Sequence, residues 1–167
     1  MNPPTFLADH MNGDLAKWLR ILGFDCKYPE SSLSDKEILE ICMREGRILL
    51  TKDRELHSYA LRRGVRSIYI SGDTLIEKFR NIYYEINLNT FIHHLNPRCT
   101  QCNSELILVK SDSIKEMLYE DVASKYDEVY LCKNCGKIYW EGSHWRGINK
   151  TISKILKLGL INNDKNI

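Results

Sequence analysis

The chain has 167 residues, 43% of them hydrophobic and 28% charged, and its formal net charge is +2. This is the composition of a globular protein and not of a disordered one, and the length suits one domain with or without a small module. A charge this close to neutral does not by itself indicate nucleic-acid binding. No apolar run is long enough to cross a membrane, and the N-terminus lacks the regions of a secretory signal, so we expect a cytoplasmic protein with no membrane partner.

Strand-like and helix-like segments alternate through the first half of the chain. Short apolar runs bounded by Gly, Pro or polar residues predict four strands, at 5–9, 24–28, 47–51 and 65–70. Apolar residues at helical spacing predict four helices, at 14–22, 35–45, 53–63 and 74–85. Ser34 and Glu37 form a capping box at the start of the second helix. This alternation predicts an α/β domain of three layers built on a parallel sheet.

The pattern changes near Pro97. Residues 87–98 predict a short helix and a hinge, and short β-like pieces then surround two cysteine pairs up to residue 140. An amphipathic pattern from Ile148 predicts a last helix. We therefore expect three parts: an α/β domain over 1–96, a β-rich module over 97–148, and a C-terminal helix with its tail over 149–167.

The cysteines predict a metal site. Four of the six form two CxxC pairs, Cys99 with Cys102 and Cys132 with Cys135. Two such pairs supply four thiolates to one tetrahedral ion, which predicts a closed, structural zinc site in a zinc ribbon. A thioredoxin-type motif would show one pair in a βαβ unit, and the ligands of iron–sulfur clusters are spaced more tightly. Gly136 follows the second pair and supplies the positive φ that such a knuckle needs. The two other cysteines are expected in the core: Cys26 and Cys42.

Three acids are predicted at strand ends or at the start of a helix. Asp9 ends the first strand, Asp53 follows the third, and Asp35 opens the helix between the second and third strands. The carboxyl ends of parallel strands meet at one edge of the sheet, so these carboxylates are able to converge there. Their repulsion would be relieved by Mg²⁺ or Mn²⁺, which supports the chemistry of nucleases. From the residues alone, separate helix caps at Asp35 and Asp53 are an equal alternative.

Several separated motifs carry a resemblance to a known family. They are FLADHMNGDLAKWLRILGFD, SDKEILEICMREGRILLTKDREL and CGKIYWEGSHWRGI, in this order. Together they resemble the PIN-like RNase domain family described from the C-terminal region of the Mut-seven exonuclease, over about residues 5–150. The resemblance implies a PIN-like Rossmannoid fold with an appended zinc ribbon, and it implies ribonuclease activity.

The resemblance also implies which residues act. Asp9, Asp35 and Asp53 match the acids of PIN-type sites, which implies that they bind Mg²⁺ or Mn²⁺ and catalyse the hydrolysis of RNA. PIN nucleases usually carry a further acid, for which Asp14 and Asp25 are candidates by position.

Basic and aromatic residues near these motifs are candidates for contacts with RNA, expected to be single-stranded. They are Lys17, Arg20, Lys52, Arg54, Trp145 and Arg146. Cations of this kind hold backbone phosphates, and an aromatic ring beside an arginine suits base stacking. The alternatives are a solvated helix face for Lys17 and Arg20, and packing of the ribbon core for Trp145.

These observations predict a metal-dependent ribonuclease whose zinc ribbon assists RNA binding. A second hypothesis is a non-catalytic RNA- or protein-binding module that keeps the same fold. A third is a phospho-receiver-like domain, which is disfavoured because a receiver has paired acids after its first strand and this chain does not.

Overall fold

The computed structural model of the protein describes residues 2–163, in which a parallel sheet forms the first half of the chain. This sheet joins β1 (Phe6–Ala8), β2 (Cys26–Lys27), β3 (Ile48–Thr51) and β4 (Ser67–Tyr69) in the order β2-β1-β3-β4. Each neighbouring pair of strands is parallel. All four strands lie within the predicted segments, so the predicted parallel sheet is confirmed.

Helices cover both faces of this sheet. Side chains alternate between the faces of a strand, so Phe6 and Ala8 of β1 pack with α1 (Gly13–Ile21) and α4 (Leu75–Glu85). Leu7 packs on the other face, with α2 (Asp35–Glu45) and α3 (Arg54–Arg62). The predicted three layers are therefore present. The capping box of α2 is confirmed as well, and Thr74 with Glu77 forms another at α4.

A small antiparallel sheet forms the second half of the chain. It joins β5 (Ile107–Lys110), β6 (Glu128–Leu131) and β7 (Ile138–Tyr139), each within a predicted β-like piece. Two elements between β5 and β6 were not predicted: the 3-10 helix η2 (Ser111–Met117) and α6 (Glu120–Lys125). Both elements lie largely at the surface, since only Ser111 and Val122 in them are buried.

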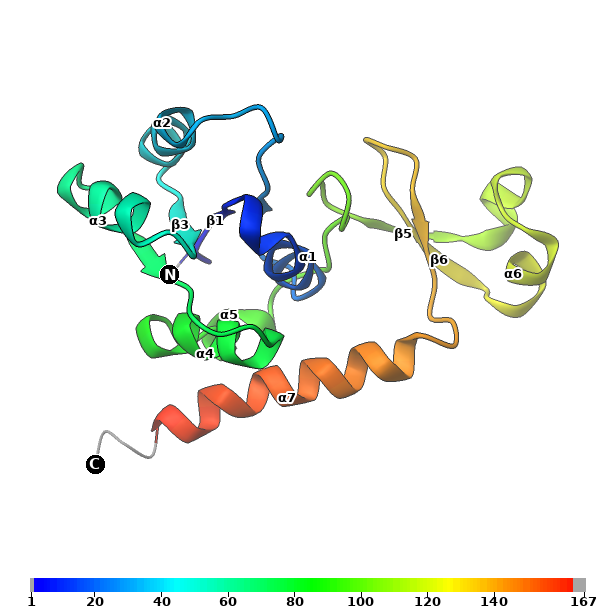
Figure 1. Ribbon diagram of the computed structural model, residues 1–167. Coiled ribbons are helices and arrows are strands. Elements are labelled where there is room, and N and C mark those ends of the chain that lie inside the picture. Colours follow the sequence, from blue (N-terminus) through cyan, green and yellow to red (C-terminus); the bar gives the residue numbers. More distant parts are fainter. Residues whose placement is uncertain (1, 164–167) are drawn as a thin grey trace.

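A long C-terminal helix, α7 (Trp145–Asn163), ties the two halves together (Figure 1). It begins before the boundary predicted at residue 149, and residues 164–167 of the predicted tail lie outside the described residues. Ile155 and Leu158 are buried in the core that α1 and α4 share. The short helix α5 (Asn89–Ile92) adds a hydrogen bond from Asn89 Nδ2 to the Leu156 carbonyl, 2.9 Å long. In the described part of the chain, no helix is long and apolar enough to cross a membrane.

The turn after α1 depends on a glycine, and we expect Gly23→Ala to destabilise the protein strongly. Gly23 has φ +93°, and a Cβ there would lie 2.5 Å from Leu95 Cβ and 2.8 Å from the Asn96 carbonyl oxygen. Gly46 is the matched control, because it also has a positive φ but no atom within 4 Å of its Cβ position. Backbone strain alone costs about 1–2 kcal/mol, which we expect for Gly46→Ala, whereas the added clash brings Gly23→Ala to roughly 3 kcal/mol or more. Thermal or urea unfolding measures both, and equal losses would contradict the close contact.

Candidate active site and cysteine cluster

Asp9 joins the ends of two neighbouring strands. It follows β1, caps the 3-10 helix η1 (His10–Asn12) and is only 5% exposed. Its Oδ1 accepts hydrogen bonds from Met11 N at 3.1 Å and Asn12 Nδ2 at 2.8 Å, and its Oδ2 accepts one from Lys52 N at 3.1 Å. The last of these bonds reaches from the end of β1 to the residue after β3. The carboxylate is therefore fixed at the carboxyl edge of the sheet.

Asp53 lies at the same edge and is exposed. It caps α3 by accepting hydrogen bonds from Glu55 N at 2.7 Å and Leu56 N at 3.0 Å, and its own N–H donates to Thr51 Oγ1 at 2.9 Å. Because β1 and β3 are parallel neighbours, Asp9 and Asp53 leave the sheet side by side. The helix-cap role that the sequence allowed for Asp53 is thus real, and it leaves the carboxylate open to solvent.

The strand order makes this edge a common place for a binding site. The chain passes from β1 to β2 on one side and then crosses back to β3 on the other, so the order reverses between β1 and β3. In open α/β sheets, ligands bind beyond the carboxyl ends of the strands at such a switch point. Asp9 and Asp53 flank it.

Asp35 does not join these two acids in a tight cluster. It is the first residue of α2 and is exposed. The loop before α2 does approach the edge, since His10 Nε2 lies 3.2 Å from the Leu33 carbonyl oxygen. Within the described residues, however, the group whose ligand atoms all lie within 4.8 Å of one another consists of cysteines, and Asp9, Asp35 and Asp53 do not form such a group.

An unpaired oxygen beside Asp9 suits a divalent cation. Asn12 is fully buried and donates through Nδ2 to Asp9, but its Oδ1 has no hydrogen-bond partner. In the described part of the chain, every other buried side-chain N or O has a partner. An amide oxygen and carboxylates are the ligand types that Mg²⁺ and Mn²⁺ take, and Mg²⁺ keeps several waters that can bridge to more distant carboxylates. The donor set therefore fits the predicted cation. Sequence reasoning missed Asn12, because only burial distinguishes it from a surface asparagine.

Neither candidate for a further acid is free at this edge. Asp14 lies in the first turn of α1. Its Oδ1 and Oδ2 accept hydrogen bonds from Nζ of the buried Lys78, at 2.6 and 2.8 Å. Asp25 precedes β2, at the opposite edge of the sheet, where its carbonyl accepts from Phe6 N. Asp14 is therefore already paired with the Lys78 ammonium. Asp25 is bonded to Arg47 and Asn103, away from the acidic edge.

The four cysteines of the CxxC pairs form one cluster. Sγ of Cys99 lies 3.6 Å from that of Cys135, and Sγ of Cys102 lies 3.4 Å from that of Cys132. Tetrahedral ligands with Zn–S bonds of about 2.3 Å stand about 3.8 Å apart, so these distances fit one ion. A hydrogen bond from Ser104 is the main cause of a lowered pKa of the Cys102 thiol.

Each pair is held in the same kind of turn. Asn103 N donates to the Cys99 carbonyl and Gly136 N donates to the Cys132 carbonyl, at 2.9 and 2.8 Å. Asn103 and Gly136 have φ of 66° and 74°, so the positive φ predicted after the second pair is also present after the first. The other two cysteines lie in the cores as predicted, and burial raises the pKa of Cys26 to about 12.

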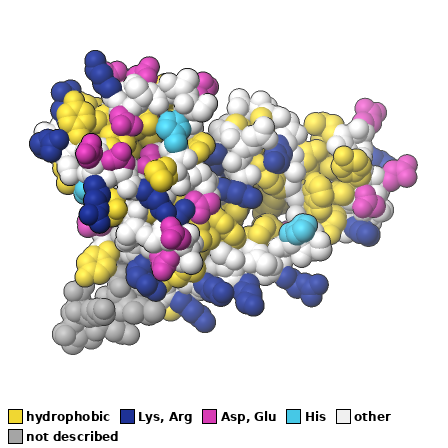
Figure 2. Space-filling model, in the orientation of Figure 1, with side chains coloured by type: hydrophobic (Ala, Val, Ile, Leu, Met, Phe, Trp, Pro, Cys, Tyr) yellow, Lys and Arg dark blue, Asp and Glu magenta, His cyan; other side chains and the backbone are white. Residues whose placement is uncertain are grey.

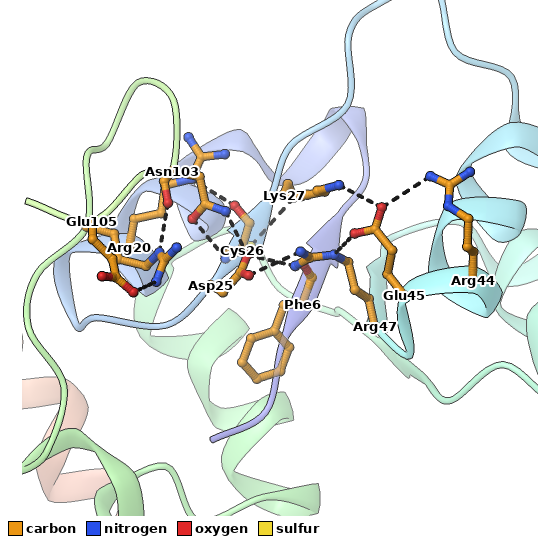
Figure 3. A network of polar contacts seen from close by, with 11 residues as sticks. Phe6, Arg20, Asp25, Cys26, Lys27, Arg44, Glu45, Arg47, Asn103 and Glu105 are labelled. Carbon is orange, nitrogen blue, oxygen red and sulfur yellow. Dashed lines mark hydrogen bonds and ion pairs between the residues drawn. The ribbon is translucent and has the colours of Figure 1, made fainter. Parts of the chain in front are cut away.

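A partly buried polar junction fixes the first cysteine pair to β2 (Figure 3). Asn103 Oδ1 accepts from Cys26 N at 3.1 Å, and its Nδ2 donates to Asp25 at 2.7 Å. Asp25 in turn accepts from Arg47 at 2.7 and 3.1 Å. Burial raises the pKa of Asp25, but the hydrogen bonds from Arg47 and Asn103 outweigh it, so the pKa lies below its usual 3.8.

Arg20 belongs to this junction and not to a basic surface. It is 6% exposed, and its guanidinium donates to the carbonyls of Cys26 at 2.8 Å, Thr100 at 2.8 Å and Gln101 at 3.3 Å. The prediction that Arg20 contacts RNA is therefore corrected. A helical position beside polar neighbours looked solvated in the sequence, because the cysteine turn that covers it lies about eighty residues further on.

The remaining predicted RNA contacts lie in two places. At the acidic edge, Lys52 pairs with Asp73 at 3.2 Å, and the Arg54 guanidinium lies over the Tyr69 ring at 5.5 Å. Away from that edge, Lys17 and Trp145 line one pocket between α1, the ribbon and α7. Arg146 is exposed at the start of α7.

We expect Asp25→Asn to lower the free energy of unfolding by roughly 1–3 kcal/mol near neutral pH, because Arg47 is only 8% exposed and loses its bidentate partner. The folded-state pKa of Asp25 is lowered, so its contribution is present above the unfolded value of 3.8 and is lost as the pH falls through the folded value. The difference between wild type and variant should therefore shrink below about pH 4. Glu105→Gln is the control, since Glu105 is 82% exposed and meets Arg98 at 3.5 Å. Equal losses for the two variants in urea unfolding would contradict the buried junction.

The chain was compared with known proteins. No curated protein and no solved structure matches it. The family model described as the Mut7-C RNAse domain matches residues 4–152, which include the acidic edge, the junction and all four clustered cysteines. The chain therefore belongs to the Mut7-C RNAse domain family.

Proposed function

We propose that the protein is a metal-dependent ribonuclease with a PIN-like fold, whose acidic edge cleaves RNA and whose cysteine cluster holds a structural zinc ion. The main support for this proposal is the match to an RNase domain family over residues 4–152. The positions of Asp9 and Asp53, which flank the switch point of the sheet, agree with it. We also propose that it acts on single-stranded RNA in the cytoplasm.

We propose distinct roles for the acidic and the basic residues of the edge. Asp9 is held by three N–H donors, so it supplies a fixed carboxylate with little freedom to move. Asp53 is exposed at the edge and Asp35 is exposed at the start of α2, so both carboxylates are open to solvent. When bound, Mg²⁺ or Mn²⁺ would offset the charge of the scissile phosphate and make an attacking water more nucleophilic. Lys52 and Arg54 flank Asp53 and would hold neighbouring phosphates.

We expect wild-type protein to cleave single-stranded RNA with Mn²⁺ or Mg²⁺, and Asp53→Asn to lower the rate by at least about 100-fold. Asparagine caps helices as well as aspartate does, so this change removes the charge and keeps the α3 cap. Asp9→Asn is a poorer probe, because an amide cannot accept at both oxygen positions of Asp9. The measurement is cleavage of an end-labelled RNA in gels, with each metal and with EDTA.

Asp121→Asn is the matched control, since Asp121 is an exposed acid in the first turn of α6, within the ribbon half. It should leave the rate unchanged. Binding of RNA without cleavage, unaffected by Asp53→Asn, would instead favour a non-catalytic binding module. Labelling of the protein by a small phosphodonor, with no cleavage, would favour a receiver-like domain.

For the cysteine cluster, we expect about one zinc ion per chain by elemental analysis and a lower content in Cys135→Ser. A structural zinc site contributes folding free energy directly, so removal of zinc should lower the melting temperature. Cys42→Ser is the control, because Cys42 is buried in the core away from the cluster and should keep its zinc. Zinc-free protein of unchanged stability would contradict a structural role.

A further inference from the structure

A pocket of about 340 Å³ lies between the two halves of the molecule. Its walls come from α1, the first cysteine turn, the ribbon and α7. Three aromatic rings line it, from Tyr130, Tyr139 and Trp145. The volume falls within the range of about 300–1,000 Å³ that is usual for small-ligand sites.

One of these rings is held rigidly in place. The Tyr139 hydroxyl accepts a hydrogen bond from Thr100 N at 3.1 Å and lies 3.1 Å from both Thr100 Oγ1 and Cys99 Sγ. The phenol is thus anchored to the first cysteine turn, and the Lys137 ammonium lies 5.6 Å from the centre of its ring. An aromatic wall that does not have to be ordered on binding favours stacking with a planar ligand.

The charge around the pocket is positive. The charged residues that line it are all cations: Lys17, Arg98 and Lys137. A basic stripe also runs along α7, on the side of the helix turned away from the pocket-lining Ile148 and Ile152. Its members are exposed and spaced four, four and three residues apart, so that they share one face: Arg146, Lys150, Lys154 and Lys157. None of the ion pairs among the described residues uses a member of this stripe. Figure 2 shows Lys and Arg side chains in a row along the edge where Figure 1 places α7.

We propose that this pocket binds one unpaired base of a single-stranded RNA, with the neighbouring phosphates held by the cations that line it, Lys17, Arg98 and Lys137. The proposal rests on the proposed ribonuclease function and adds to it a base-binding site separate from the acidic edge. An apolar, aromatic pocket with a cationic rim combines the two features by which proteins hold single strands, stacking on bases and attraction of phosphates.

The position of the pocket suits a strand that continues to the acidic edge. Lys17 lies on α1 about one helical turn beyond Gly13, and α1 itself starts a few residues after Asp9. Ile21, at the far end of α1, also lines the pocket. The exposed side of α1 therefore leads from the pocket towards Asp9 and Asp53, so a base held in the pocket would place RNA a short distance from the proposed site of cleavage.

The first test measures the affinity for a short fluorescent single-stranded RNA, with Asp53→Asn in every protein and no Mg²⁺ or Mn²⁺ added, so that nothing is cleaved. Trp145→Ala should weaken binding by roughly 10–100-fold, because loss of one base–aromatic stack has an effect of this size. Trp145→Phe keeps a ring and should retain most of the affinity. Trp140→Ala is the matched control, because Trp140 is an exposed tryptophan of the same half that does not line the pocket.

A second variant guards against misfolding of Trp145→Ala. Lys17 is exposed, so Lys17→Gln leaves the fold intact, and it should weaken binding and lower the slope of log affinity against log salt by about 0.7. Lys36→Gln, at an exposed lysine of α2, should change neither.

Abasic substitutions then locate the base. Replacing the nucleotides of the RNA one at a time with abasic sites should weaken binding most at one position, and that loss should disappear in Trp145→Ala. Equal effects of Trp145→Ala and Trp140→Ala, or an abasic effect that persists unchanged in Trp145→Ala, would overturn the proposal. Binding of lipid vesicles but not RNA would also overturn it and would assign α7 to a membrane surface.

Failure of the pocket and failure of the nuclease are distinguishable. If wild type cleaves RNA but Trp145→Ala does not change the RNA affinity, the base-binding pocket is wrong and the ribonuclease stands. If one base position is bound specifically but no metal supports cleavage, the pocket stands and the protein is a non-catalytic RNA-binding module.

Discussion

The carboxylate of Asp9 accepts three N–H donors at the end of β1, and one of them comes from the backbone of Lys52, beyond β3. This contact ties together the two central strands at the place where the strand order reverses. It holds a buried negative charge in a fixed position, and it sets where Asp53 leaves the sheet. The candidate active site, its open side and the direction of α1 away from it all follow from this arrangement.

The ribbon half depends on a second set of contacts, made with the opposite edge of the sheet. Arg20, Asp25, Arg47 and Asn103 join the first cysteine turn to β2 through buried and partly buried hydrogen bonds, and α7 returns from the ribbon to the core beside α4. Two attachments limit the motion of the ribbon relative to the sheet. The pocket between them is consequently a built feature of the fold, with walls contributed by segments far apart in the chain.

Much of this fold was predictable from the sequence, because its signals are local. The apolar runs of β1 and β3, the capping box at Ser34 and the two CxxC pairs each depend on residues a few positions apart. Features that depend on tertiary contacts were not predictable. Arg20 looked like a surface cation until the cysteine turn covered it, and Asn12 had no signal beyond its nearness to Asp9. Convergence of Asp35 with the other acids stays a prediction, since sequence spacing cannot give the distance between a helix start and a strand end.

We propose that the edge formed by Asp9, Asn12 and Asp53 binds a divalent cation, and titration of isotopically labelled, zinc-loaded protein with Mn²⁺ by NMR tests this most directly. Paramagnetic broadening should appear first at the amides of Met11, Lys52 and Glu55, whose N–H groups contact these carboxylates, and it should saturate. The same broadening should be weakened in Asp53→Asn and unchanged in Asp121→Asn. Broadening spread evenly over exposed acids, with no preference for this edge, would contradict a cation site there.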